Sequence, residues 1–247
     1  MPEKVALVTG GASGIGRAIS IRLAEDGYTV VIVDRNSLLI DDVIESITRN
    51  SGRAYKQQID VTNEEALSQL FQNWAANYGR LDVLINNAAM SKPKPLVDTE
   101  PALWDAVMDV NLKGVYTCCR LAYPLLKYGG NVVNISSIQS QSLAEGNAAY
   151  GISKAGVNYL TRVLAKEWLK DRIRVNAVLP AGVDTPLFRE VVGVNSEEAL
   201  RKLETSIEEG EIQTSEQIAG VVSLLLRPEA SIITGTCLVA DGGSQLR

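Results

Sequence analysis

Short apolar runs alternate with longer amphipathic stretches along the whole chain. Strands are predicted at Lys4–Thr9, Tyr28–Val33, Arg53–Ile59, Asp82–Asn86, Asn131–Ser136, Ile173–Leu179 and Thr236–Ala240, and the apolar run of the first indicates a buried strand of a parallel sheet. Apolar residues at helical spacing predict helices between them, at Arg17–Asp26, Glu64–Tyr78, Glu100–Lys127, Ala148–Asp171 and Ser215–Leu226. This strict alternation predicts an α/β fold, with a doubly wound seven-stranded parallel sheet, right-handed crossovers and helices on both faces.

The alternation runs on without a linker, a repeat or a break in composition, so we expect a single domain over residues 1–247. One segment interrupts it, because residues 186–213 are polar and charged and fill a connection that is normally short. We interpret residues 186–213 as a small helical lid that binds substrate, with residues 191–193 as its bend. The alternative is a solvated surface loop without a function.

The turn after the first predicted strand is rich in glycine. It reads Gly10-Gly11-Ala12-Ser13-Gly14-Ile15-Gly16 and leads directly into a helix. Backbone N–H groups and the helix dipole at such a junction form an anion site, and glycine is needed where a Cβ would block the phosphate. We therefore predict a Rossmann fold in which the cofactor's pyrophosphate contacts Gly10, Ser13, Gly14, Ile15 and Gly16.

An acidic residue ends the second predicted strand. Asp34 follows the glycines by about twenty residues, where a carboxylate binds the ribose hydroxyls of NAD. Its charge would repel the additional phosphate of NADP. Arg35 could instead receive that phosphate, but we weigh Asp34 more heavily and predict NAD as the cofactor.

A serine, a tyrosine and a lysine form the candidate catalytic set. Tyr150 and Lys154 lie about one helical turn apart and share a helix face, and Ser137 precedes them. An ammonium group beside a phenol favours the phenolate, so we expect Lys154 to lower the pKa of Tyr150 from its ordinary value of about 10. Such a phenol can exchange a proton with an alcohol, while Ser137 holds the substrate oxygen. The Tyr-x-x-x-Lys spacing is weak alone, since ordinary helix faces also carry it.

Together these motifs resemble the short-chain dehydrogenase/reductase family. The resemblance extends from Lys4 to Asp241-Gly242-Gly243 and rests on the glycine-rich turn after Thr9, Asn86-Asn87-Ala88-Ala89, Asn111, Ser137, Tyr150 and Lys154. It implies hydride transfer between a nicotinamide and a secondary alcohol or ketone. It also implies one doubly wound domain in a homotetramer, with the helices at 100–127 and 148–171 pairing the subunits.

The resemblance implies a role for each matching residue. Tyr150 would be the general acid/base, Lys154 would lower its pKa and bind the nicotinamide ribose, and Ser137 would hydrogen-bond the substrate oxygen. Asn111 would hold a water in a proton relay behind Lys154. The cofactor would further contact Asp60, Val61, Asn87, Ala88, Pro180, Val183 and Thr185.

Two positions depart from the family pattern. Ala89 stands where the family's Asn-Asn-Ala-Gly segment has glycine, and Ala181 separates Pro180 from Gly182, which are adjacent in the family. Ala181 must therefore adopt a compatible backbone angle, or the loop is shifted.

Composition narrows the function classes. A formal net charge of -5 argues against a general nucleic-acid or anionic-membrane surface. The chain has no histidine, which excludes a histidine-based triad or a histidine metal site, and we predict no metal. Cys118, Cys119 and Cys237 are too few for a disulfide framework and are expected to be buried thiols. With no signal peptide before Lys4 and no apolar run of spanning length, we expect a cytoplasmic protein.

The substrate should bind at the carboxyl ends of the strands. The segment 138–147 is polar, so we expect Gln139 and Asn147, with Leu187, to contact a hydroxylated substrate such as a sugar, polyol or hydroxy acid. Lys92 and Lys94 could meet a carboxylate, although surface lysines are usually solvated.

Three function classes stay open. We favour an NAD-dependent dehydrogenase acting on secondary alcohols. The second class is a reductase of 3-oxoacyl thioesters, which normally prefers NADP. The third is a non-enzymatic NAD-binding sensor, a class that often loses the catalytic tyrosine or lysine.

Overall fold

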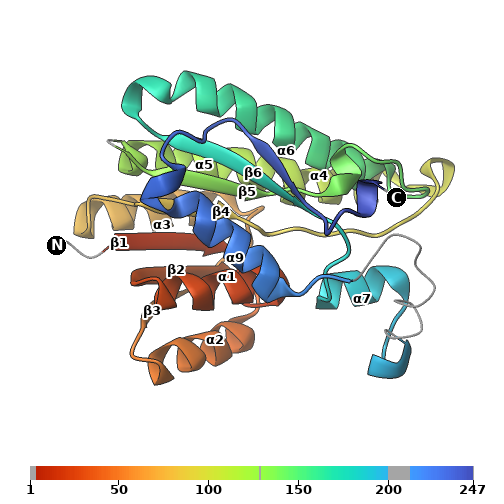
Figure 1. Ribbon diagram of the computed structural model, residues 1–247, viewed down its shortest axis with the longest axis horizontal. Helices are drawn as coiled ribbons and strands as arrows, with labels where there is room; N and C mark the ends of the chain where they lie inside the picture. The colour runs from red at the N-terminus through yellow and green to blue at the C-terminus, as the bar shows by residue number, and fades with distance from the viewer. Residues whose placement is uncertain (1–3, 128, 200–211, 247) are drawn as a thin grey trace.

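The computed structural model describes residues 4–127, 129–199 and 212–246, and it contains one seven-stranded parallel sheet (Figure 1). The strand order is β3-β2-β1-β4-β5-β6-β7. The strands are β1 Lys4–Thr9, β2 Tyr28–Asp34, β3 Arg53–Gln58, β4 Val83–Asn86, β5 Asn131–Ile135, β6 Arg174–Pro180 and β7 Cys237–Ala240. The predicted doubly wound Rossmann sheet is confirmed, and each strand end lies within one residue of its prediction.

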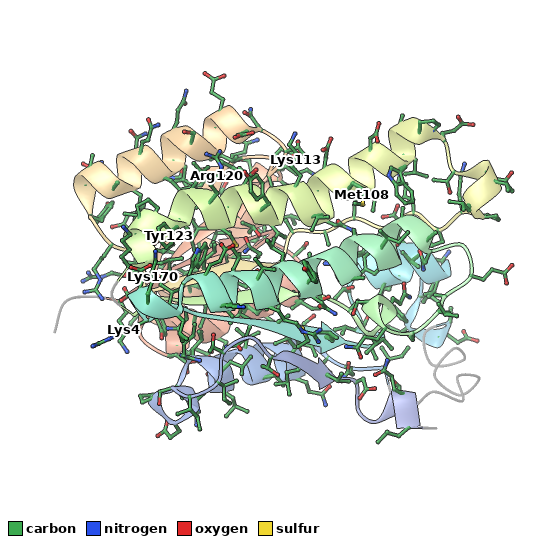
Figure 2. The ribbon with its side chains drawn as sticks, turned by 90° about the horizontal axis from the view of Figure 1, so that it is seen from above. Lys4, Met108, Lys113, Arg120, Tyr123 and Lys170 are labelled. Atoms are coloured by element: carbon green, nitrogen blue, oxygen red, sulfur yellow. The ribbon has the colours of Figure 1, made fainter. Side chains whose placement is uncertain are left out.

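Helices cover both faces of the sheet. One layer holds α1 Gly14–Glu25, α2 Ser37–Arg49 and α9 Ser215–Leu226. Figure 2 shows the opposite layer from above, where α3 Glu64–Asn77, α5 Gly114–Leu126 and α6 Ala148–Glu167 lie side by side. The strand residues alternate between two apolar clusters, so Val5 and Leu7 face α3, α5 and α6 while Ala6 and Val8 face α1 and α9. Burial on both faces explains why β1, β2 and β4 are almost continuously apolar, whereas the edge strand β3 is polar and is exposed or only partly buried along its length.

The strand order reverses between β1 and β4. β1 pairs with β2 on one side and with β4 on the other, and all pairings are parallel. In open α/β sheets the crevice outside the carboxyl ends at such a reversal is the usual ligand site. In Figure 1 the N-terminus lies at the amino ends of the strands, whereas α7 Pro186–Val192 and the C-terminus lie at the carboxyl ends.

Helix α2 was not among the predicted helices. Its buried residues Ile40, Val43 and Ile47 follow helical spacing, and the Asn36 side chain accepts a hydrogen bond from the Leu39 N–H at 3.2 Å. Both signals are present in the sequence, so periodicity and capping together could have identified this helix.

The predicted helix Glu100–Lys127 is wrong as a regular α-helix. It divides into α4 Pro101–Met108, a π-helical turn Asp109–Lys113 and α5. The helical path continues through this turn, as the labelled Met108, Lys113 and Arg120 show in Figure 2. The π turn turns Asn111 inward, where it is fully buried and exchanges hydrogen bonds of 2.8 and 2.9 Å with the Met90 backbone. This exchange of bonds explains why the regular helix is interrupted there.

The predicted lid begins with α7. Thr185 caps it by accepting the Phe188 N–H at 3.1 Å, and Gly193, with φ of 70°, ends it. The expected bend at residues 191–193 coincides with this helix end. Residues 200–211 of the predicted lid lie outside the described residues.

Candidate active site

A cleft of about 660 Å³ lies at the carboxyl ends of the strands. It is lined by the glycine-rich turn, the ends of β2 and β5, the loops at residues 87–92 and 136–139, the start of α6 and helix α7. All the predicted site residues line it except Gly16 and Asn111, which are buried. Residues that are far apart in the sequence therefore meet in one cavity.

Two glycines of the glycine-rich turn, Gly10 and Gly16, have no room for a side chain. A Cβ on Gly16 would lie 2.0 Å from the Gly10 carbonyl oxygen, and one on Gly10, whose φ is 59°, would lie 2.8 Å from the Ala88 Cα. Ser13 begins α1 without a side-chain capping hydrogen bond, which leaves the first N–H groups of the helix for an anion. This cradle fits the pyrophosphate of a dinucleotide.

The carboxylate of Asp34 is oriented at the edge of the cleft by two backbone N–H groups. One oxygen accepts from Ala12 at 3.2 Å and the other from Asn36 at 3.0 Å. Arg35, the next residue in the sequence, lines the same cleft. Asp60 is also oriented, since its Oδ1 accepts from the Thr62 N–H at 2.9 Å. The two acids thus lie where the adenosine half of a dinucleotide is held in a Rossmann fold.

Lys154 is the buried cation of the site. Only 2% of it is exposed, its Nζ donates to the Ile135 carbonyl oxygen at 2.8 Å, and it lies 5.6 Å from the centroid of the Tyr150 ring. Burial lowers the pKa of Lys154 from 10.5 to about 8. The ammonium group is therefore held by helix α6 against the end of β5, beside the phenol.

The predicted lowering of the Tyr150 pKa by Lys154 is wrong in this structure. Burial raises the pKa of Tyr150, and the smaller opposing effect comes from a hydrogen bond with Ser137. The hydroxyl of Ser137 also accepts the Gln139 N–H at 3.1 Å, so Ser137 lies between the phenol and the following turn. The chain presents Tyr150 as a neutral phenol at pH 7.

The substrate side of the cleft holds amide side chains. The Oε1 of Gln139 is buried and has no hydrogen-bond partner among the described residues. Asn147 accepts from the Ser91 hydroxyl at 3.3 Å through its Oδ1, and Leu187 enters the cleft from α7. A buried acceptor without a partner in a cleft indicates a ligand that can donate a hydrogen bond.

Sequence reasoning missed several residues that line the cleft. These are Val33, Ile59, Met90, Val110, Ile135, Ser136 and Ser244, whereas Glu190, Val192 and Ile212 belong to the predicted lid. Ser244 comes from the C-terminal turn, where its hydroxyl bonds Asp241 at 3.1 Å. The only local signal for it is the turn sequence Asp241-Gly242-Gly243, which predicts the turn but not its position beside the cleft.

Ala181 does not require a strained backbone. Among the described non-glycine residues, only Ser51 and Arg172 have a φ in the left-handed region. The Ala181 N–H donates to Gln213 Oε1 at 3.1 Å, and the Gln213 N–H donates to the Gly182 carbonyl at 2.8 Å. Gln213, which the sequence did not single out, thus ties the far end of the lid segment to the loop after β6.

The three cysteines are free thiols, and burial makes the thiolate form of Cys118 and Cys119 unfavourable. Cys118 and Cys119 are buried as predicted, whereas Cys237 is partly exposed. Burial raises the pKa of the Cys119 thiol to about 12. Within the described ranges, no three acidic or thiol side chains are grouped so as to hold a metal ion. In the same part of the chain, every helix is too short or too polar to cross a membrane.

Residues 10–245 match the family described as enoyl-(acyl carrier protein) reductase. The 3-oxoacyl-(acyl-carrier-protein) reductase FabG of Thermotoga maritima is 34% identical over 242 residues, which cover 97% of each chain. The cis-4-hydroxycyclohexanecarboxylate dehydrogenase of Sinomonas cyclohexanicum is 38% identical, over 98% of this chain and 96% of its own. The crystal structure of a dehydrogenase/reductase from Sinorhizobium meliloti 1021 superposes with a TM-score of 0.90 at 32% identity, over 99% of this chain and 96% of the other.

Proposed function

The chain belongs to the short-chain dehydrogenase/reductase family of oxidoreductases, and from this premise we propose that it transfers a hydride between NAD(H) and a secondary alcohol or ketone. One observation carries the proposal. Ser137, Tyr150 and Lys154 line the same cleft as the glycine-rich turn and Asp34. A proton-transfer group and a dinucleotide cradle in one cavity are the two parts that alcohol oxidation requires.

The proposed cofactor is NAD. The cradle of Gly10, Ser13 and Gly14 would hold its pyrophosphate, and the oriented carboxylate of Asp34 would accept hydrogen bonds from the adenosine ribose. Bound there, the nicotinamide supplies the acceptor or donor of the hydride. Asn87, Ala88, Pro180, Val183 and Thr185 line the cleft where its other half would lie.

Tyr150 is the proposed general acid/base. In oxidation its phenolate takes the hydroxyl proton of the substrate, and in reduction its phenol returns that proton to the carbonyl oxygen. Ser137, which already bonds the phenol, would hydrogen-bond the same oxygen. Lys154, whose Nζ lies 5.6 Å from the centroid of the Tyr150 ring, would bind the hydroxyls of the nicotinamide ribose. The proposed proton relay through a water held by Asn111 would run behind Lys154.

The proposed substrate carries additional hydroxyl groups. The unpartnered Oε1 of Gln139 supports this, because a substrate hydroxyl would supply the hydrogen bond that this buried oxygen lacks. Asn147 uses its Oδ1 on Ser91, so its NH₂ group is the part available to a substrate oxygen. In this proposal Leu187 and the rest of residues 186–213 close over the substrate within the single domain.

A specific observation favours a second candidate, reduction of 3-oxoacyl thioesters. The loops beside the cleft expose Leu96, Val97 and Leu143, and such an apolar rim would suit an acyl chain. The similarity to the Thermotoga maritima reductase points the same way. Asp34 opposes this candidate where the reductase depends on NADP.

The proposed assembly is a homotetramer in the cytoplasm. Helices α5 and α6 expose Tyr116, Ile152 and Tyr159, with Tyr159 72% exposed, and a second copy could cover these side chains. A reducing compartment suits the free thiols. Light scattering of the purified protein tests the assembly, and a monomer would contradict it.

The decisive experiment measures absorbance at 340 nm with NAD and then NADP. The panel contains sorbitol, xylitol, 3-hydroxybutanoate and cyclohexanol, and acetoacetyl thioesters with the reduced cofactors. Turnover of a polyol or hydroxy acid with NAD supports the proposal. Turnover of the thioester alone favours the second candidate, and NAD binding without any turnover favours a sensor.

A further inference from the structure

The turn that presents Ser137 is fastened to the helix that presents Tyr150. This turn, Ile138–Ser140, follows β5 and packs against α6. Besides the bond between Ser137 and Tyr150, two hydrogen bonds join residues 136–140 to α6. The Ser136 hydroxyl donates to the Lys154 carbonyl oxygen at 3.2 Å, and Asn158 Nδ2 donates to the Ser140 hydroxyl at 2.7 Å.

The second of these bonds continues to Ser137. The Ser140 hydroxyl donates its single proton to the Ser137 carbonyl oxygen at 2.6 Å. It can therefore only accept from Asn158, so the amide must present its NH₂ group to Ser140. Asn158 therefore donates to Ser140, and Ser140 donates to the backbone carbonyl of Ser137. The direction of both hydrogen bonds is fixed because the Ser140 hydroxyl has a single proton.

Asn158 is an unusual choice for its position. Only 7% of it is exposed, and its Oδ1 is buried without a partner in the part of the chain that the structure describes. A buried unpaired acceptor destabilises the fold, and an apolar residue of similar shape would avoid that cost. The NH₂ group of Asn158 does have a partner, the Ser140 hydroxyl, which in turn is hydrogen-bonded to the Ser137 carbonyl oxygen.

We propose that Asn158 is a positioning residue, which holds Ser137 at the reacting oxygen by acting through Ser140. The inference rests on the proposed role of Ser137. Asn158 lies one helical turn beyond Lys154, so the same helix carries the acid/base, the cation and the group that orients the serine. We call the hydrogen-bonded chain Asn158–Ser140–Ser137 the clamp. Because Gln139 lies in the same turn, the clamp also positions the Gln139 side chain, which lines the cleft.

The test replaces the donor with an acceptor of the same shape. Asn158→Asp places a carboxylate against a hydroxyl that has no proton left to give. We expect kcat, measured with NAD and the panel alcohol of highest turnover, to fall roughly tenfold, since small misplacements of reacting groups have effects of this order or larger. The dissociation constant for NAD should stay within about twofold, because the clamp does not touch the glycine-rich turn.

Ser140→Ala breaks the same chain without a buried charge and keeps the test open if the aspartate variant does not fold. The matched control is Thr161→Val. Thr161 is also buried on α6 and hydrogen-bonded, to Asn134 and to the Val157 carbonyl, but it has no link to the turn. The control should lower the melting temperature and preserve kcat. An equal loss of kcat in Thr161→Val would overturn the inference.

The double variant separates the inference from the proposed function. If Asn158 acts through Ser137, adding Asn158→Asp to Ser137→Ala should cause no further loss of kcat. Multiplicative losses would overturn the inference and leave the role of Ser137 intact. Full activity of Ser137→Ala alone would overturn the proposed role of Ser137, and the inference with it.

Discussion

The two ends of the cleft differ in which parts of the chain form them: backbone atoms and buried strands at one end, and side chains on loops at the other. At the cofactor end, buried strands and backbone atoms define the site: a Cβ on Gly10 or Gly16 would collide with other backbone atoms, and Asp34 is oriented by two backbone N–H groups. At the substrate end, side chains on loops define it, and nearby residues such as Val97 and Leu143 are more than nine-tenths exposed. Few buried contacts restrain such loops, so the substrate end can vary while the cofactor end cannot.

The proposed catalytic residues, Ser137, Tyr150 and Lys154, lie between the two ends of the cleft. Tyr150 and Lys154 belong to a helix of the core, whereas Ser137 belongs to the turn that begins the substrate loop. The hydrogen bonds between α6 and Ser136 and Ser140 restrain the backbone on both sides of Ser137. The variants below perturb one end while the other is measured, and they are ordered by the expected effect.

Tyr150→Phe should lower kcat by about 10³-fold, because it removes the proton-transfer group and keeps the ring. The affinity for NAD should persist, since the cradle for the pyrophosphate is untouched. Steady-state kinetics and fluorescence titration with NAD measure the two effects separately. Retained activity would refute the assigned acid/base.

Asp34→Ser should shift the ratio of kcat/KM for NADP over NAD by roughly 10²-fold toward NADP, since it removes a negative charge from the site of the additional phosphate. Arg35→Ala is the matched control at the neighbouring position and should move the ratio in the opposite direction. An unchanged ratio in Asp34→Ser would show that another group selects the cofactor.

Lys154→Met should abolish turnover and yet stabilise the fold at neutral pH. Burial lowers the pKa of Lys154 from 10.5 to about 8, which corresponds to a cost of about 3 kcal/mol in the charged form. Loss of the hydrogen bond to Ile135 offsets about 1 kcal/mol of the gain. We expect a net stabilisation of about 2 kcal/mol, or roughly 5 °C in melting temperature.

The pH dependence of this difference is a sharper test. Because the folded pKa lies below the unfolded one, the cost of Lys154 is complete below pH 8 and disappears as the pH rises toward 10.5. Thermal unfolding of wild type and Lys154→Met between pH 7 and 10.5 should therefore show the stability advantage of the variant disappearing as the pH rises. A constant difference would show that packing, not charge, separates the two proteins.

Gln139→Leu should raise KM for a polyol roughly tenfold, because a substrate hydroxyl loses its acceptor. KM for cyclohexanol, which has no second hydroxyl, should stay the same or fall. Equal KM changes for both alcohols would contradict the proposal that Gln139 recognises an additional hydroxyl group. NAD affinity serves as the control at the other end of the cleft.

The amino-acid sequence by itself determined the strands and the cofactor end. Short apolar runs that alternate with amphipathic helices indicate strands buried on both faces of a parallel sheet, and the glycine-rich turn and Asp34 are local signals next to the first two of these runs. The same holds for Tyr150 and Lys154, whose separation in one helix places them together. Local physics is sufficient for these features because each depends on neighbouring residues.

The tertiary structure decided what depends on contacts between distant segments. The π turn at Asn111 follows from its bonds to Met90 and Ser153, the raised pKa of Tyr150 follows from burial in the assembled cleft, and Ser244 reaches the cleft from the far end of the chain. The clamp from Asn158 to Ser137 joins a helix to a turn that is remote in sequence. No local pattern encodes these features, since burial and hydrogen bonding between segments arise only when the chain has folded.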